Sequence, residues 1–190
     1  MIPALHPFRV HHFGAASPWV DLTNSEMWDG FGKLTDFLDD PQWIADFLEH
    51  WHFRVAPPGP AEIRELRKLR KLLRQLVQKA SAGSTLRAKD VAALNDWLKV
   101  PVFRQLVENQ NGLQLACAAA QIGWPDALAR IAASLAESLA HDPHNRLKIC
   151  ANPGCLWVFV DRTKGNVRRW CNDATCGNRD RVRRSRARIK

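Results

Sequence analysis

The sequence predicts a mainly α-helical protein in two parts, a helical N-terminal domain followed by a small treble-clef-like zinc finger made of a β-hairpin and a basic C-terminal helix. Three observations predict it. Apolar residues recur at helical spacing between residues 41 and 140, four of the five cysteines fall in the last 41 residues, and positive charge gathers in that same segment. A length of 190 residues suits one medium domain and a small one, which we place at residues 1–145 and 146–190.

The N-terminal part reads as a series of helices. Asp39 or Asp40 can cap a helix that begins at Pro41 and runs to about His52, and Pro60 begins a long helix that ends at Ser81 to Ser84. Further amphipathic segments surround residues 91–98 and 125–140, while residues 102–121 fit either short helices or a hairpin. Cys117 lies in this ambiguous segment, and we expect it to be a small buried apolar residue. Residues 142–145 have the composition of a turn and mark the boundary.

Charge divides the chain at that boundary. Residues 146–190 carry thirteen Lys or Arg and three Asp, a net charge of +10, whereas residues 1–145 carry a net charge of −1. Such asymmetry indicates a polyanionic partner for the C-terminal part. The helix over residues 60–81 also has a basic side, which fits either a solvated face, the interpretation we favour, or a second phosphate-binding surface.

The cysteines form two matched pairs, Cys150 with Cys155 and Cys171 with Cys176, with fifteen residues between the pairs. Two such turns joined by a mid-length insert are typical of a tetrahedral four-thiolate site, and we expect one structural Zn²⁺; an iron–sulfur cluster and a redox pair are the alternatives. His141 and His144 precede the first cysteine and are expected to be linker residues.

Between the cysteine pairs the sequence predicts a hairpin, with residues 156–160 as one strand, a turn over 161–165, and residues 166–170 as its partner. Trp157 and Trp170 flank the pairs, and we expect them to form the small core of the finger, with stacking on bases as the alternative. The second cysteine pair then opens the terminal helix.

The C-terminal helix is rich in arginine, which can hold a phosphate or a guanine edge with two hydrogen bonds. Arg179, Arg183 and Arg186 fall on one face at helical spacing, and Val182 and Ile189 can pack on the finger. The candidate nucleic-acid-binding residues are Arg168, Arg169, Arg179, Arg183, Arg184 and Arg186.

The run Trp170 to Arg179, which reads WCNDATCGNR, resembles the bacterial CGNR zinc-finger family, as do the cysteine pair at 150 and 155 and the Trp157-x-Phe159-x-Asp161 pattern. The segment 19–25, WVDLTNS, is similar to the LDLVNT motif that opens the ABATE domain, a domain associated with stress-induced transcription regulators. Trp-Val in place of the usual first apolar pair and Ser in place of Thr are mild departures. The resemblance covers nearly the whole chain and implies a DNA-binding transcription regulator.

Asp21 and Asn24 lie within this opening motif. They are candidates either for lining the pocket of a small-molecule effector or for capping the first helix, and we favour capping.

Other function classes fit the sequence less well. Without a nucleophile–base pair, a phosphate loop or paired carboxylates, we expect no enzymatic activity. Without a signal peptide or an apolar run long enough for a bilayer, we expect a cytoplasmic, nucleoid-associated protein with no membrane partner. An RNA-binding or ribosome-associated protein and a protein–protein adaptor are the alternatives to a DNA-binding regulator, and the oligomeric state stays open.

Overall fold

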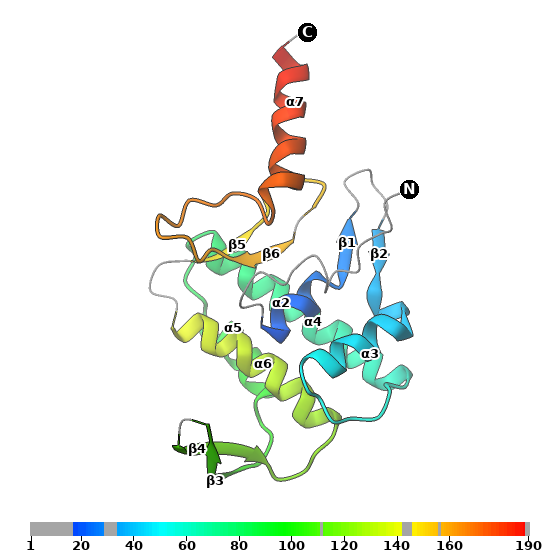
Figure 1. Ribbon diagram of the computed structural model, residues 1–190, viewed down its shortest axis with the longest axis vertical. Helices are drawn as coiled ribbons and strands as arrows, with labels where there is room; N and C mark the ends of the chain where they lie inside the picture. Colours follow the sequence, from blue (N-terminus) through cyan, green and yellow to red (C-terminus); the bar gives the residue numbers. More distant parts are fainter. Residues whose placement is uncertain (1–16, 29–33, 111, 142–145, 156, 189–190) are drawn as a thin grey trace.

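The computed structural model describes residues 17–28, 34–110, 112–141, 146–155 and 157–188. The turn predicted at residues 142–145, including His144, and the positions of Leu156 and Ile189 lie outside these residues. Figure 1 shows a helical body with a small two-stranded hairpin at one end of the long axis and a helix projecting at the other. In the described part of the chain, no helix is both long and apolar enough to cross a membrane.

In the part of the chain that the structure describes, five helices build the body, and their ends follow the sequence signals. They are α2 (Pro18–Asn24), α3 (Pro41–His50), α4 (Pro60–Ser81), α5 (Ala88–Trp97) and α6 (Trp124–Ala140). Asp40 caps α3 by accepting a hydrogen bond from the backbone of Gln42, and Pro41 takes the first helical position. Pro60 begins α4, where the carboxylate of Glu62 accepts from Gly59 N at 2.8 Å. The predicted helices over 41–52, 60–81 and 125–140 are therefore confirmed within two residues at each end.

The core forms where α2 meets the long helices. The ring of Trp19 on α2 is buried, and its indole Nε1 donates to Ser138 Oγ of α6 at 3.0 Å. The leucine stripe of α4 and the apolar side of α6 pack around it, and Leu66, Leu73 and Leu135 are almost completely buried. The leucines of this stripe therefore belong to the protein's own core.

The N-terminal part is not purely α-helical. A short hairpin pairs β1 (Glu26–Trp28) with β2 (Leu34–Asp36), which leads through a 3₁₀ turn, η1 (Phe37–Asp39), into α3. The ambiguous segment is a second hairpin, β3 (Val102–Asn109) with β4 (Gly112–Ala119), paired in register over eight residues of each strand. Cys117 on β4 is exposed, so the expectation of a buried cysteine was wrong. The hairpin stands away from the helical core (Figure 1), and the Cys117 side chain is exposed there.

The basic side of α4 is neither a simple solvated face nor open for phosphate along its whole length. Arg70 is buried and holds Asp36 with two hydrogen bonds of 2.6 and 2.8 Å, and it also donates to Ser25 Oγ. Arg67 pairs with Asp36 and Asp39. These arginines fasten the β1–β2 hairpin and η1 to the body, while Arg64 and Lys71 remain exposed.

The C-terminal part joins the same core. It comprises β5 (Leu147–Ile149), β6 (Val158–Val160), a π-helical turn η2 (Asp173–Gly177) and α7 (Asn178–Arg188). Leu147 and Val158 are buried together with the residues of the helical body. The finger is therefore packed on the N-terminal part and not merely tethered to it.

The predicted partner of the finger strand was wrong. Strand β6 pairs antiparallel with β5, which precedes the first cysteine, and not with residues 166–170. Two features explain the difference. At Val158, the side chain of Asn24 bonds the β6 backbone in place of a further strand, and Asn166 has a positive φ of 49°, which does not continue an extended strand.

Candidate metal centre and the basic arm

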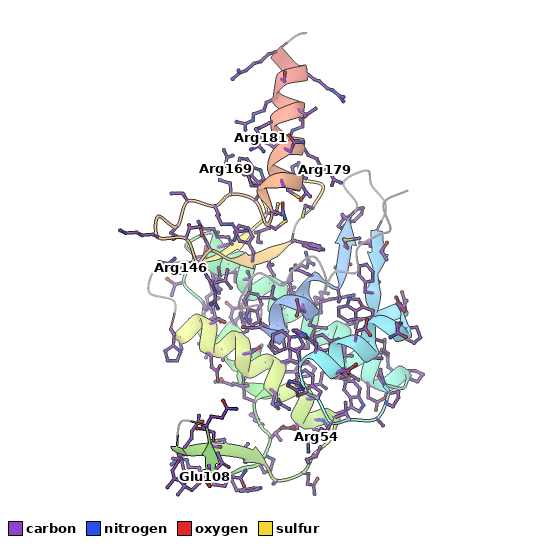
Figure 2. The ribbon with its side chains drawn as sticks, viewed as in Figure 1. Arg54, Glu108, Arg146, Arg169, Arg179 and Arg181 are labelled. Carbon is purple, nitrogen blue, oxygen red and sulfur yellow. The ribbon has the colours of Figure 1, made fainter. Side chains whose placement is uncertain are left out.

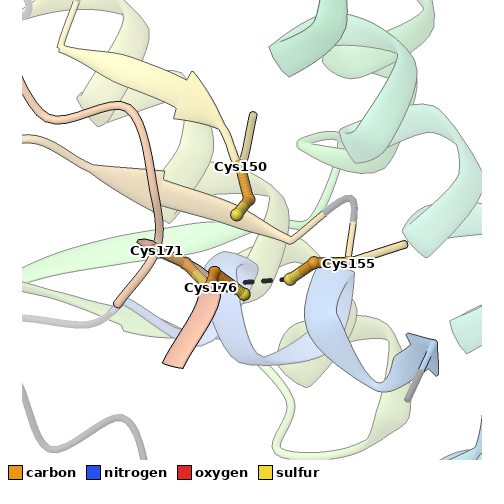
Figure 3. Close-up of side chains that lie close together, drawn as sticks. All are labelled: Cys150, Cys155, Cys171 and Cys176. Carbon is orange, nitrogen blue, oxygen red and sulfur yellow. Dashed lines mark hydrogen bonds between the residues drawn. The ribbon is translucent and has the colours of Figure 1, made fainter. Parts of the chain in front are cut away.

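The four cysteine sulfurs gather at one point between the finger's two turns. Cys150, Cys155, Cys171 and Cys176 are all buried, and their sulfurs lie within 4.8 Å of one another (Figure 3). The sulfurs of Cys155 and Cys171 are 3.7 Å apart, and those of Cys171 and Cys176 are 3.8 Å apart. A tetrahedron with Zn–S bonds of about 2.3 Å has S···S edges of about 3.8 Å, so these two separations match those of a four-thiolate Zn²⁺ site.

The first turn positions Cys150 and Cys155 through its backbone. The amide of Cys150 donates to Trp157 O at 2.7 Å, so the turn closes as the tip of the β5–β6 hairpin. Asn152 shapes the turn because its side chain accepts from Gly154 N and its carbonyl accepts from Cys155 N. This use of Asn152-Pro153-Gly154 is what the turn sequence predicts.

The second turn positions Cys171 and Cys176 at the start of α7. Asn172 caps it by accepting from Thr175 N with its side chain and from Gly177 N with its carbonyl. Gly177 lies in a tight setting, since a Cβ there would displace the carboxylate of Asp173 and lie 3.3 Å from the ring of Trp170. A larger residue at 177 would therefore have to displace the Asp173 side chain and shift the ring of Trp170.

The protonation of the four thiols depends on a cation. The pKa of Cys155 and of Cys171 is raised, first by hydrogen bonds with neighbouring sulfurs and then by burial, whereas that of Cys176 is lowered by the same set of hydrogen bonds. Four buried sulfurs this close cannot all be anionic by themselves, because like charges repel and burial disfavours charge. A divalent ion makes all four thiolates favourable, and the finger is thus built for one structural Zn²⁺.

A buried carboxylate organises the loop between the cysteine pairs. Asp161 has no exposed surface and accepts from Lys148 Nζ at 2.8 Å, Arg168 N at 2.8 Å, and both the amide and hydroxyl of Thr163. Although burial raises the pKa of Asp161, these hydrogen bonds lower it well below its usual range. The residue stands in the motif that carries the family resemblance, but its structural role was not predicted.

The two tryptophans belong to the finger, as expected. Trp157 is buried beside the cysteines and Trp170 packs against the same cluster. His141 ends α6, where its Nδ1 lies 2.9 Å from Glu137 O. In the residues described by the structure, the metal-ligand cluster consists of cysteines alone.

Asn24 joins the N-terminal part to the finger. Its Nδ2 donates to Val158 O at 3.0 Å, and its Oδ1 accepts from Val158 N at 2.9 Å, in a buried setting. Arg74 reaches the same region and donates to Thr23 O at 2.7 Å. The expectation that Asn24 caps the first helix was wrong, because Asn24 is the last residue of α2 and acts on β6.

Asp21 is buried in the interior and does not cap α2 either. Its carboxylate accepts a 2.9 Å hydrogen bond from Trp51 Nε1. Burial raises the pKa of Asp21 to about 7, against the lowering effect of the Trp51 hydrogen bond. Neither Asp21 nor Asn24 lines the apolar hollow of about 530 Å³ on the body, whose wall includes Leu38, Ile44 and Ile63.

Helix α7 (Asn178–Arg188), here called the basic arm, projects from the body and carries a series of arginines. Figure 2 shows Arg169, Arg179 and Arg181 around the first turns of the helix. Arg179, Arg183 and Arg186 share one side, where with Asn152, Pro153, Gly154 and Asp180 they border a hollow of about 450 Å³. The predicted common face of these three arginines is thus confirmed, and it continues onto the zinc turn.

Other residues of the arm depart from expectation. Val182 is 42% exposed and lines this hollow, so it does not pack on the finger. Asp180 is buried and pairs with Arg183 at 2.7 Å and with Arg184 at 3.1 Å, which places one acidic group inside the arginine-rich side.

Arg168 and Arg169 lie on the loop and not on α7. Arg168 donates to Cys171 O at 2.6 Å and covers the ring of Phe159, and Arg169 stacks over Trp170. Arg168 therefore braces the finger, whereas Arg169 is exposed at its surface.

Two family models match the chain in sequence order. Residues 16–142 match the ABATE model, described as a putative stress-induced transcription regulator, and residues 146–189 match the CGNR zinc finger. A search of curated proteins gives no match.

Proposed function

The chain belongs to the ABATE family and carries a CGNR zinc finger, and from this premise we propose that it is a DNA-binding transcription regulator. The finger would grip duplex DNA through the arginine-bearing side of α7. The observation that carries the proposal is helix α7 itself, which projects from the body (Figure 1) and has Arg179, Arg183 and Arg186 on one side.

The charge of the finger supports this proposal. One Zn²⁺ with four thiolates has a net charge of −2, so residues 146–190 keep about +8 when the metal is bound. A helix of this width fits the major groove of B-DNA, and arginine forks bind both phosphates and guanine edges. Because about half of the finger's net charge is on a single short helix, we expect many phosphate contacts and few base contacts.

We assign the finger to the treble-clef class. The supporting features are a zinc-binding turn at the tip of a hairpin, here β5 with β6, and a second pair of ligands at the beginning of a helix. In this arrangement the metal fixes the direction in which α7 leaves the body, so zinc loss should also remove the DNA-binding surface.

The N-terminal part would regulate the finger and not catalyse a reaction. Asn24, Leu147 and Val158 connect the helical body to the zinc turn, so a change in the body can reach the arm. A small apolar effector could use the hollow bounded by Leu38, Ile44 and Ile63. We propose a response to stress and a cytoplasmic location on the nucleoid, both on the basis of the family description.

The test compares two triple variants that each remove three positive charges. In one, Arg179, Arg183 and Arg186 become Gln; in the other, Arg64, Lys68 and Lys71 of α4 become Gln. Fluorescence anisotropy with a pool of labelled duplexes should show a loss of about a hundredfold in affinity for the first variant and little change for the second. Equal losses in both would refute a site on α7.

The same assay separates the RNA alternative. Each protein is also titrated with single-stranded RNA of matched length and composition. Tighter binding to that RNA than to duplex DNA, lost in the α7 variant, would make the arm an RNA-binding element. Absence of binding to both nucleic acids would favour the protein–protein adaptor.

A further inference from the structure

The β3–β4 hairpin exposes an unusual amount of apolar surface. Val102, Leu106, Leu113 and Leu115 are each between 60% and 71% exposed. Successive side chains in a strand point to opposite faces, and the register pairs Leu106 with Leu115 and Glu108 with Leu113. All four apolar residues therefore lie on one face of the hairpin, together with Arg104, Glu108 and Cys117.

This hairpin gains little from the rest of the molecule. It lies at the end of the long axis opposite α7 (Figure 1), and within the described residues each of its strands pairs only with the other. A two-stranded hairpin by itself is marginally stable in water, and a strand edge without charges invites pairing. Strand β4 contains no charged residue in its eight positions. An exposed apolar face of this kind indicates that another surface covers it.

We propose that the cover is the same face of a second copy of this chain, in a two-fold symmetric dimer. A two-fold axis that crosses the strands at the Leu106–Leu115 pair places Leu106 against Leu106 and Leu115 against Leu115 of the other copy. The same axis places Arg104 of each copy opposite Glu108 of the other, because both stand two residues from Leu106 on the same face. The face is thus complementary to itself, because leucines meet leucines and each arginine meets a glutamate.

The two charges support this arrangement over a foreign partner. Arg104 and Glu108 are exposed and make no ion pair with each other or with another residue in the described ranges. An interface between two copies pairs Arg104 of each copy with Glu108 of the other, which gives two ion pairs per dimer. Pairing edge to edge would leave the leucines in water, so we infer contact through the faces.

The expected dimer is weak and reversible. Strands of eight residues span about 25 Å, and two strands are about 10 Å wide, so the footprint is far below the ~800 Å² per partner of a standard interface. We expect a dissociation constant in the micromolar range, without dependence on zinc-finger contacts or on DNA. The inference is therefore independent of the proposed function.

The experiment measures the oligomeric state of the full chain by sedimentation equilibrium, from low micromolar to submillimolar concentration. The wild-type protein should be a reversible dimer. Leu115→Arg should be a monomer, whereas Gln114→Arg, the neighbouring position on the opposite face, should dimerise like the wild type. Helical circular dichroism and zinc content serve to confirm that each variant is folded.

Charge reversal tests the symmetry. Arg104→Glu places like charges opposite each other twice per dimer and should weaken dimerisation by on the order of tenfold or more. The double variant Arg104→Glu with Glu108→Arg restores opposite charges between copies and should recover the wild-type constant. Alkylation of the exposed Cys117 thiol should also slow as dimer forms.

Three results would overturn the inference. The first is a wild-type chain that stays monomeric throughout the concentration range. The second is a dimer that Leu115→Arg leaves intact, and the third is a double variant that dimerises as weakly as Arg104→Glu alone.

Discussion

The clearest energetic consequence of the structure concerns Asn24, whose amide bonds both backbone groups of Val158. Asn24→Ala removes two hydrogen bonds and leaves a buried N–H and a buried C=O of β6 without partners. Each orphaned group costs about 1–3 kcal/mol, so the variant should lose about 2–6 kcal/mol of the free energy of unfolding. This is a large part of the stability of an ordinary domain.

The assay is equilibrium urea unfolding, followed both by circular dichroism and by zinc release to a chromogenic chelator. Because Leu147 and Val158 belong to the main core, the two signals should change together in the wild type. In Asn24→Ala, zinc release should move to lower urea at least as far as the helical signal, since the lost bonds hold the finger.

A neighbouring variant provides the control. Thr23 is also buried on α2, and its hydroxyl donates to Trp19 O within the same helix. Thr23→Val should lower the free energy of unfolding by about 1 kcal/mol, because it removes one hydrogen bond to Trp19 O, a carbonyl that lies within the helix. A loss below 1 kcal/mol for Asn24→Ala, or an equal loss for Thr23→Val, would refute the reasoning.

Three further predictions test the metal, the buried acid and the basic arm. Elemental analysis should find about one zinc per chain, and Cys171→Ser should lose it together with the fold of the finger; a folded, zinc-free tail would contradict the metal site. Asp21 binds a proton more tightly in the native than in the unfolded chain, so the free energy of unfolding falls as pH rises from about 4 to 7. In paired urea titrations, the free energy of unfolding of Asp21→Asn relative to that of the wild type should therefore rise by about 2–3 kcal/mol between pH ~5 and ~8; a difference that does not change with pH would exclude this titration. Asp180→Asn removes the acid that holds Arg183, and anisotropy should show duplex affinity raised by about threefold to tenfold; weaker binding would mean that the ion pair orders the arm for DNA.

The zinc ligands and most helix boundaries were predictable because their signals are local. Asp40 and Pro41 stand side by side in the sequence, and each cysteine pair lies within a single turn. Charge asymmetry likewise located the basic arm without any knowledge of tertiary structure.

Other features depend on contacts between distant parts of the chain. Asn24 acts on Val158, 134 residues away, and this contact blocks the edge of β6 where a partner strand was expected. The spacing of cysteines and aromatic residues in the finger does not encode it. The sequence also suggested a buried Cys117, because composition alone does not reveal that a hairpin stands away from the core.

The central claim is that the arginines of α7 bind the phosphates of DNA, and the salt dependence of duplex affinity tests it most directly. Each neutralised phosphate releases condensed counterion, so six contacts give a slope of about −5 in a plot of log affinity against log salt. Replacing Arg179, Arg183 and Arg186 by Gln should flatten that slope by about three while the zinc stays bound. A slope that is the same in the wild type and in this variant would contradict the claim.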